Sequence, residues 1–210
     1  IDGFNKTVFA SEYGGGQTRS QLYVRKFNKP VRFYLRIQTA EPIMEHLQQF
    51  ILSLSSLIKG LDVAITDRPG DANFVVHVVP KSAYARTVRD VVYRDQDAVA
   101  RGRCMVRAIY NRRGIIRSEA VIVADQGMGQ FNRCMIEEIL QGLGPLNDHA
   151  SLSKSMFNDQ SRFTTLQPFD RVILNMLYDP AVHAGAAQHT VQPILPSVVR
   201  RVRQHMKQLD

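Results

Sequence analysis

The stretch that decides the fold runs from Cys134 to Asp148 and reads CMIEEILQGLGPLND. Residues four apart share one face of a helix, so Glu137 and Gln141 are expected side by side. Gly144 is placed to end the helix, and Asn147 and Asp148 follow directly after it. We therefore expect a helix and a turn that direct polar side chains toward one site.

The spacing of this stretch is that of a zinc-protease helix, in which two ligands four apart face the metal and a Glu follows the first. Glu137 occupies the first ligand position, Gln141 the second and Asn147 the third. Zinc prefers thiolate, imidazole and carboxylate ligands, and an amide is a poor substitute. Glu138 stands at the catalytic base position, but without zinc it has no acidified water to deprotonate. The stretch indicates a scaffold more firmly than an activity.

Three interpretations of these polar residues remain open. In the first, Glu137, Glu138 and Gln141 form a polar patch in a former active-site cleft, hydrogen-bonded to Asn147, Asp148 or backbone. In the second, Glu137 and Gln141 with Asn147 or Asp148 form an oxygen-rich site for a hard cation. In the third, the adjacent carboxylates perform acid/base chemistry, although neighbours on a helix diverge by about 100°. No cofactor is expected under the first interpretation, and zinc or another divalent cation is the alternative.

Composition indicates a soluble globular protein with a basic surface. The chain has 210 residues, 44% of them hydrophobic, and a formal net charge of +8. Its 27 Lys and Arg are scattered along the chain, so no specific nucleic-acid partner is expected, although anionic polymers are candidate partners. No apolar run has the length of a transmembrane segment.

The order of hydrophobic patterns predicts an α/β fold. Val31 to Ile37 alternates as a half-buried strand, and a helical stripe follows from about Ala40 to Lys59. Further strands are expected at 61–65, 72–79, 104–110 and 115–124. Between residues 81 and 103 we expect a polar excursion over the surface, with a possible helical turn near Ala83 to Val92. A sheet with one long backing helix is the expected result.

The two cysteines, Cys104 and Cys134, fall on a predicted strand and on the key helix. In an exported protein a disulfide between them is plausible, whereas in a cytosolic protein two buried thiols are the simpler expectation.

The C-terminal part contains a predicted helix from about Pro168 to Tyr178 and a basic tail. We expect one domain over residues 1–178 and a basic extension over 179–210, packed on the domain or trailing it. The helix at Val198 to Lys207 is expected to pack on the domain through its valines, and binding of an anionic polymer is the alternative.

This order of elements resembles the zincin fold of metzincin proteases, in particular the matrixins. The resemblance rests on a strand, a long helix, further strands, the key helix, a methionine turn at Met156 and a closing helix. It implies a twisted mixed sheet with a long backing helix and the key helix at a cleft, and it places Met156 among the cleft residues.

The amino-acid sequence of several segments also resembles that of the bacterial domain-of-unknown-function family 2927. The segments are 4–13, 30–32, 137–144, 156–159 and 177–180. The resemblance implies an exported protein of the bacterial envelope, periplasmic or secreted, with no established activity.

These observations together predict a zincin-like protein that binds an extended peptide or an envelope polymer without catalysis. The peptide is expected to add as a strand along an edge strand near Ile115 to Ala124. A hydrolase with an oxygen-rich metal site is the first alternative, and a basic adaptor for anionic polymer is the second.

Overall fold

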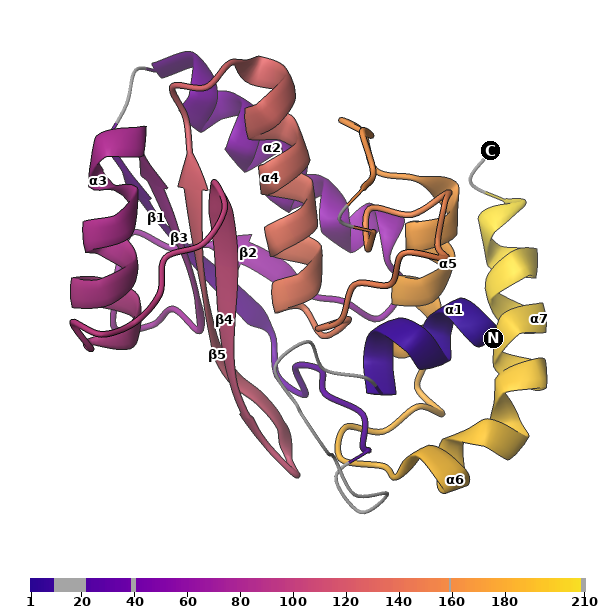
Figure 1. The fold of residues 1–210 in the computed structure, drawn as a ribbon. Coiled ribbons are helices and arrows are strands. Elements are labelled where there is room, and N and C mark those ends of the chain that lie inside the picture. Colours follow the sequence, from indigo (N-terminus) through magenta and orange to yellow (C-terminus); the bar gives the residue numbers. More distant parts are fainter. Residues whose placement is uncertain (10–21, 39–40, 159, 209–210) are drawn as a thin grey trace.

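The computed structural model describes residues 1–9, 22–38, 41–158 and 160–208. A five-stranded mixed sheet is covered by helices on both faces, and a further group of helices lies beside it (Figure 1). The strands are β1 (Val31–Ile37), β2 (Val63–Ile65), β3 (Phe74–Val79), β4 (Cys104–Asn111) and β5 (Gly114–Val123). The fold is therefore mixed α/β.

The strand order is β2-β1-β3-β5-β4. β1 pairs in parallel with β2 and β3, and β3 pairs in parallel with β5. β4 runs antiparallel to β5 in a hairpin, with Cys104 opposite Ile122 and Asn111 opposite Gly114. The prediction of an edge strand at Ile115 to Ala124 was wrong, because β5 is paired on both sides and β4 forms the edge.

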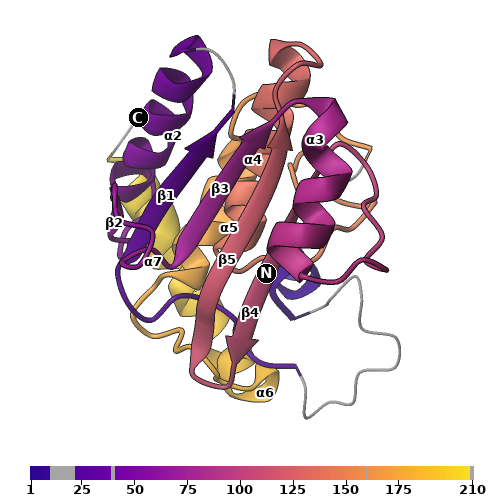
Figure 2. The same cartoon turned by 90° about the vertical axis from the view of Figure 1, so that its left-hand side faces the viewer.

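One face of the sheet carries the main core. The long helix α2 (Glu41–Leu57) and the key helix α4 (Met128–Gly142) both lie on this face, behind the sheet in Figure 2. Leu47, Ile51 and Leu54 of α2 are fully buried, as the helical spacing predicts. Alternation along the strands turns Phe33, Phe74 and their same-face neighbours toward these helices.

The opposite face is covered in part by α3 (Lys81–Arg86) and the π-helix η3 (Thr87–Tyr93), which lie in front of the sheet in Figure 2. They bury a second, smaller apolar cluster that includes Val79, Tyr84, Val88 and Val121. The possible helical turn near 83–92 is thus part of a longer helical run that ends at Tyr93, and only the second half of the predicted excursion is a loop. The helical half is held by apolar residues whose partners lie on the sheet.

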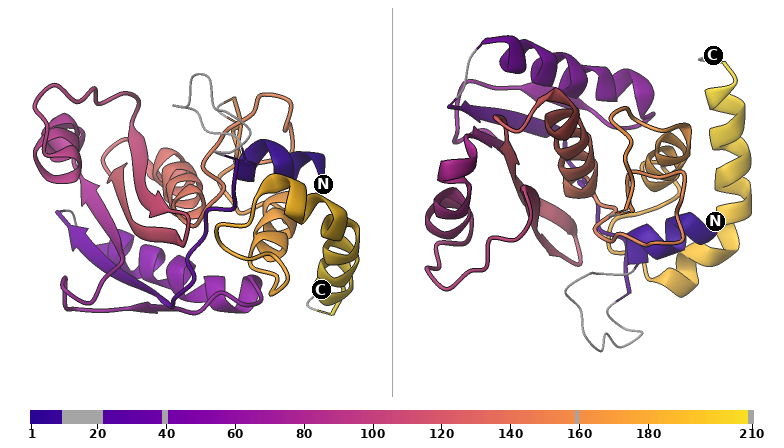
Figure 3. Two further views of the ribbon diagram at one scale, coloured as in Figure 1. Left: turned by 90° about the horizontal axis from the view of Figure 1, so that it is seen from below. Right: turned by 45° about the horizontal axis from the view of Figure 1, so that its top comes forward.

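A helical group completes the molecule and contains α1 (Asp2–Phe4), the π-helix η1 (Asn5–Phe9), α5 (Pro168–Leu177), α6 (Gln188–Val191), the 3₁₀ helix η4 (Gln192–Ile194) and α7 (Leu195–Met206). Both views in Figure 3 place α5 between α4 and α7. Val198 and Val202 of α7 are buried in the main core, as the valine spacing predicts.

Segments far apart in sequence join near Val24. Its N–H donates to Ala186 O at 2.9 Å, and its carbonyl accepts from Gly185 N at 2.8 Å. Residues from the predicted C-terminal extension thus share backbone hydrogen bonds and one core with the segment before β1. The predicted positions 10–13, Ala40 and Asp159 lie outside the described residues.

Candidate binding cleft

A cleft of about 890 Å³ is lined by the edge strand β4 and by helix α4. β4 and the loop that precedes it line one side, where Arg101, Arg103 and Arg107 contribute positive charge. The other side is the polar wall of α4. In the described part of the chain β4 pairs only with β5, so its second edge faces this space.

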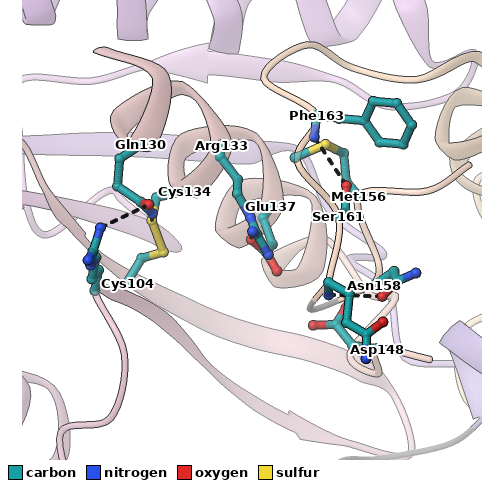
Figure 4. A network of polar contacts seen from close by, with 12 residues as sticks. Cys104, Gln130, Arg133, Cys134, Glu137, Asp148, Met156, Asn158, Ser161 and Phe163 are labelled. Atoms are coloured by element: carbon teal, nitrogen blue, oxygen red, sulfur yellow. Dashed lines mark hydrogen bonds and ion pairs between the residues drawn. A yellow bond between two sulfur atoms is a disulfide. The ribbon is translucent and has the colours of Figure 1, made fainter. Parts of the chain in front are cut away.

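A disulfide between Cys104 and Cys134 ties the start of β4 to α4 (Figure 4). Beside it, Gln130 donates its Nε2 to Cys134 Sγ at 3.1 Å and accepts from Arg103 Nη1 at 3.4 Å. Because one covalent bond and these contacts join the two walls at one end, the separation of β4 from α4 is fixed there.

Helix α4 has one apolar and one polar face. Phe131, Ile139 and Leu140 are fully buried in the main core, and Arg133, Glu137 and Gln141 recur at every fourth position on the cleft side. Arg133 Nε lies 3.3 Å from Glu137 Oε2, forming an ion pair (Figure 4). Glu137 is only 7% exposed and Gln141 9%. The polar wall therefore stands at the bottom of the cleft.

The end of α4 is fixed by close packing against the sheet. Ser118 Oγ on β5 donates to Gly142 O at 2.7 Å, and a Cβ at Gly142 would lie 2.4 Å from the Phe74 ring. Gly144 has φ +144°, and a Cβ there would lie 2.3 Å from Arg25 O, so only glycine fits this turn.

The turn after Gly144 brings Asp148 back to the helix. Gln141 Nε2 donates to Asp148 Oδ1 at 2.9 Å. Glu137, Glu138, Gln141 and Asp148 all line the cleft, so the structure brings together four of the residues that the sequence singled out.

Asn147 was expected in this set, and the structure places it elsewhere. Its Nδ2 donates to Lys6 O and to Asp148 O, each at 2.8 Å. Asn147 is 8% exposed and is not among the residues that line the cleft. It holds the N-terminal helical segment against the loop after α4, because its side chain turns away from Gln141 toward the backbone of Lys6.

Met156 was also predicted as a cleft residue and does not line the cleft. It is fully buried, and its backbone N–H donates to Asp170 Oδ2 of α5 at 2.9 Å. Ser155 Oγ donates to Asp170 Oδ1 at 2.5 Å and accepts from Phe157 N at 3.0 Å. The turn at Met156 is therefore anchored on α5 beneath the loop, away from the open cleft.

Asp170 is the buried carboxylate of this anchor, and the sequence analysis did not single it out. Burial raises the pKa of its carboxyl to about 6, although the hydrogen bonds from Ser155 and the Met156 N–H act in the opposite direction. An acidic residue in the first turn of a helix is common, so the sequence alone carries no signal for a buried anchor.

The oxygen-rich metal set of Glu137, Gln141 and Asn147 does not fit the side chains found here. Arg133 places a cation beside Glu137, and Asn147 does not line the cleft. Asp148 Oδ1, the alternative third ligand, already accepts from Gln141 Nε2 at 2.9 Å. Over the described ranges of the chain, no three His, Cys, Asp or Glu side chains are grouped so as to hold a metal. No reaction step through a metal is derived for this site.

Residues 1–197 match a family described as Protein of unknown function (DUF2927). The chain belongs to this family. The match confirms the resemblance to this family that the sequence segments indicate. The matched residues include all those that line the cleft and Asp170. A comparison with curated proteins finds no match.

The cationic side of the cleft was not predicted from the sequence. Arg101 and Arg103 belong to a segment whose charged residues show no sustained period, and Arg107 lies on the strand that follows it. Arg107 is held in place by donating to Val92 O at 2.6 Å and by lying 4.8 Å above the Tyr93 ring.

Among the described helices, none has both the length and the apolarity to cross a membrane.

Proposed function

We propose that this protein binds an extended peptide in the cleft by strand addition to β4, without catalysis. The carrying observation is that one edge of β4, which has no partner strand among the described residues, faces a cleft of about 890 Å³. An edge strand offers backbone N–H and C=O groups to an added strand, and neighbouring side chains then select the residues of the ligand.

The charges of the two walls support a peptide as the ligand. On the β4 side Arg101 and Arg103 outnumber the one carboxylate, Asp95. On the α4 side three carboxylates outnumber Arg133, namely Glu137, Glu138 and Asp148. A peptide of mixed charge meets a partner of opposite sign on each wall, whereas an anionic polymer meets like charge along α4. We therefore place the peptide ahead of an anionic envelope polymer.

A zincin-like scaffold is part of this proposal. The antiparallel edge strand β4, the helix α4 behind it, the buried turn at Met156 and the closing helix α5 follow in the order expected of such a scaffold. Glu138 stands at the base position, and with no fitting metal set nearby we assign it to binding.

We also propose that the protein is exported to the bacterial envelope. The Cys104–Cys134 disulfide supports this location, because such bonds persist in oxidising compartments. A cytosolic location of the mature protein, with both thiols reduced in cells, would contradict this part of the proposal.

Hydrogen exchange followed by NMR tests the binding mode. The probe is a blocked six-residue peptide of alternating Val and Thr with one central Lys, and the control peptide carries Glu in its place. We expect the Lys peptide to slow exchange of backbone amides in β4 and to leave β2, the opposite edge, unchanged. Equal protection of both edges, or none in β4, would overturn the proposal.

A further inference from the structure

A second cavity of about 200 Å³ lies where the ends of α2 and α5 meet α7. It shares no lining residue with the cleft. Its volume is below the roughly 300–1,000 Å³ typical of sites for drug-sized ligands, so it suits a small group. Three basic side chains, Lys59, Arg201 and His205, line it.

The guanidinium of Arg201 is held in a fixed orientation. Its Nε donates to Asp179 Oδ2 at 3.1 Å and its Nη2 donates to Asp179 Oδ1 at 2.8 Å. This pairing uses two of its five N–H donors. Because a planar fork fixed in this way loses little freedom on binding, the remaining donors are ready for an oxyanion.

The carboxylate of Asp179 is compensated by its own contacts. Besides Arg201, it accepts the Ala181 N–H at 2.9 Å, and the Lys26 ammonium adds positive charge from the core side. Burial would raise the pKa of Asp179, but these contacts outweigh it and lower the pKa. Asp179 thus orients Arg201, and its negative charge is already matched.

Two helix ends that would repel an anion are capped. Asn175 Nδ2 donates to Leu57 O at 2.8 Å at the end of α2, and Lys26 Nζ donates to Leu177 O at 2.9 Å at the end of α5. Asn175 Oδ1 also accepts the Lys59 N–H at 2.9 Å, which fixes the backbone of Lys59 at the cavity.

Lys59 and His205 complete the set. Within the described part of the chain, neither side chain forms a hydrogen bond or an ion pair. An ammonium and an imidazole with donors to spare therefore share a small cavity with a fixed guanidinium. This combination of donors is typical of sites for phosphate oxygens.

We propose that the cavity formed by Lys59, Arg201 and His205 binds a phosphoryl group. The ligand is free phosphate or the terminal phosphate of a larger molecule, with the oxygens facing the three basic side chains. The exposed Arg200 and Arg203 on the same helix add to the local positive potential without lining the cavity.

Titration calorimetry with inorganic phosphate, at constant ionic strength, tests this site. We expect binding in phosphate and none in matched chloride. Lys59→Gln and His205→Gln should each weaken binding about tenfold, because each removes a charged or polar donor to the anion. Arg200→Gln removes the same charge from α7 outside the cavity and should change affinity less than about twofold.

The outcomes distinguish a specific phosphate site from non-specific attraction of phosphate by the positive charge of the surface. If Arg200→Gln weakens phosphate binding as much as Lys59→Gln, or if phosphate behaves like chloride, the proposal is wrong. Vesicles of phosphatidylcholine doped with phosphatidic acid then distinguish the sources. Vesicle binding that is lost in Lys59→Gln assigns a lipid phosphate, and phosphate binding without vesicle binding assigns a soluble phosphate.

Discussion

Two polar clusters involve the chain that follows α4, and they use similar groups differently. The cleft wall, formed by Arg133, Glu137, Gln141 and Asp148, borders an open cavity. The anchor cluster, formed by Ser155, Met156 and Asp170, is sealed from solvent. Groups that face a cavity can exchange partners when a ligand arrives, whereas sealed groups have only each other.

The comparison teaches that burial alone does not identify a binding residue. Glu137 is 7% exposed and Asp170 is 0% exposed, yet only Glu137 borders a space that a ligand can enter. Substitutions in the anchor cluster should therefore lower stability, and substitutions in the cleft wall should mainly alter binding.

The largest expected effect comes from the covalent bond between the walls of the cleft. Replacing both Cys104 and Cys134 by Ser should lower the free energy of unfolding by about 3.5 kcal/mol, because the closed loop restrains the unfolded chain. Urea unfolding measures it, and the unmutated protein in reductant should show a similar loss. A loss below about 1 kcal/mol would show that the bond contributes little to stability.

Asp170→Ala should lower the free energy of unfolding by about 3 kcal/mol, because Ser155 Oγ and the Met156 N–H each lose a buried acceptor. Urea unfolding is again the measurement. Asp170→Asn is the matched control and should lose less, since its amide oxygen still accepts one hydrogen bond. Equal losses in the two variants would mean that packing, and not the hydrogen bonds, makes the anchor.

Stability should depend on pH through Asp170. Burial raises its pKa from 3.8 in the unfolded chain to about 6, so the folded state binds more protons between these values. This contribution to stability is present below pH 3.8 and is lost as pH rises through about 6.

Unfolding at pH 4.5 and at pH 7 measures the loss, which we expect to be about 2 kcal/mol. Glu119 and Asp179, whose pKa values are lowered in spite of burial by hydrogen bonds from basic partners, act in the opposite direction. The contribution of Asp170 is therefore the difference between the unmutated protein and Asp170→Asn. A difference that does not change with pH would refute it.

In the cleft wall the expected loss is smaller. Glu137→Gln removes the ion pair with Arg133 and should lower the free energy of unfolding by about 1 kcal/mol. The matched control is Asp90→Asn, whose ion pair with Arg86 has the same 3.3 Å separation on an exposed helix surface. The control should lose less than about 0.5 kcal/mol. A loss from Glu137→Gln as large as that from Asp170→Ala would erase the distinction between the two clusters.

The smallest expected effect is that of a chelator. Because the cleft wall offers no fitting set of metal ligands, EDTA should shift the melting temperature by less than about 1 °C. A melt with and without EDTA, together with elemental analysis of protein purified without chelator, checks it. A larger drop in melting temperature, together with a stoichiometric metal, would favour the alternative of a metal-dependent hydrolase.

The sequence predicted local features well. β1 has the predicted bounds, because apolar and polar residues alternate directly along Val31 to Ile37. The key helix was located by Glu137 and Gln141, although α4 begins at Met128, six residues before the quoted stretch. Both features depend on neighbours in sequence.

Features that depend on distant partners were not predicted. The choice between β4 and β5 as the edge is set by the pairing of β5 with β3, which the strand patterns alone do not encode. Asn147 bonds to Lys6, 141 residues away, and Asp170 is buried by the turn at Met156. A polar side chain in sequence does not reveal whether its partner is a ligand or the protein itself.

The joint between Val24 and residues 185–186 bears on when the protein can fold. A chain is synthesised from its N-terminus, so the backbone partners of Val24 emerge about 160 residues after it. Until then Val24 lacks these two hydrogen bonds, and the core that it shares lacks Val182 and Leu195. The native core thus closes only when nearly the whole chain is available.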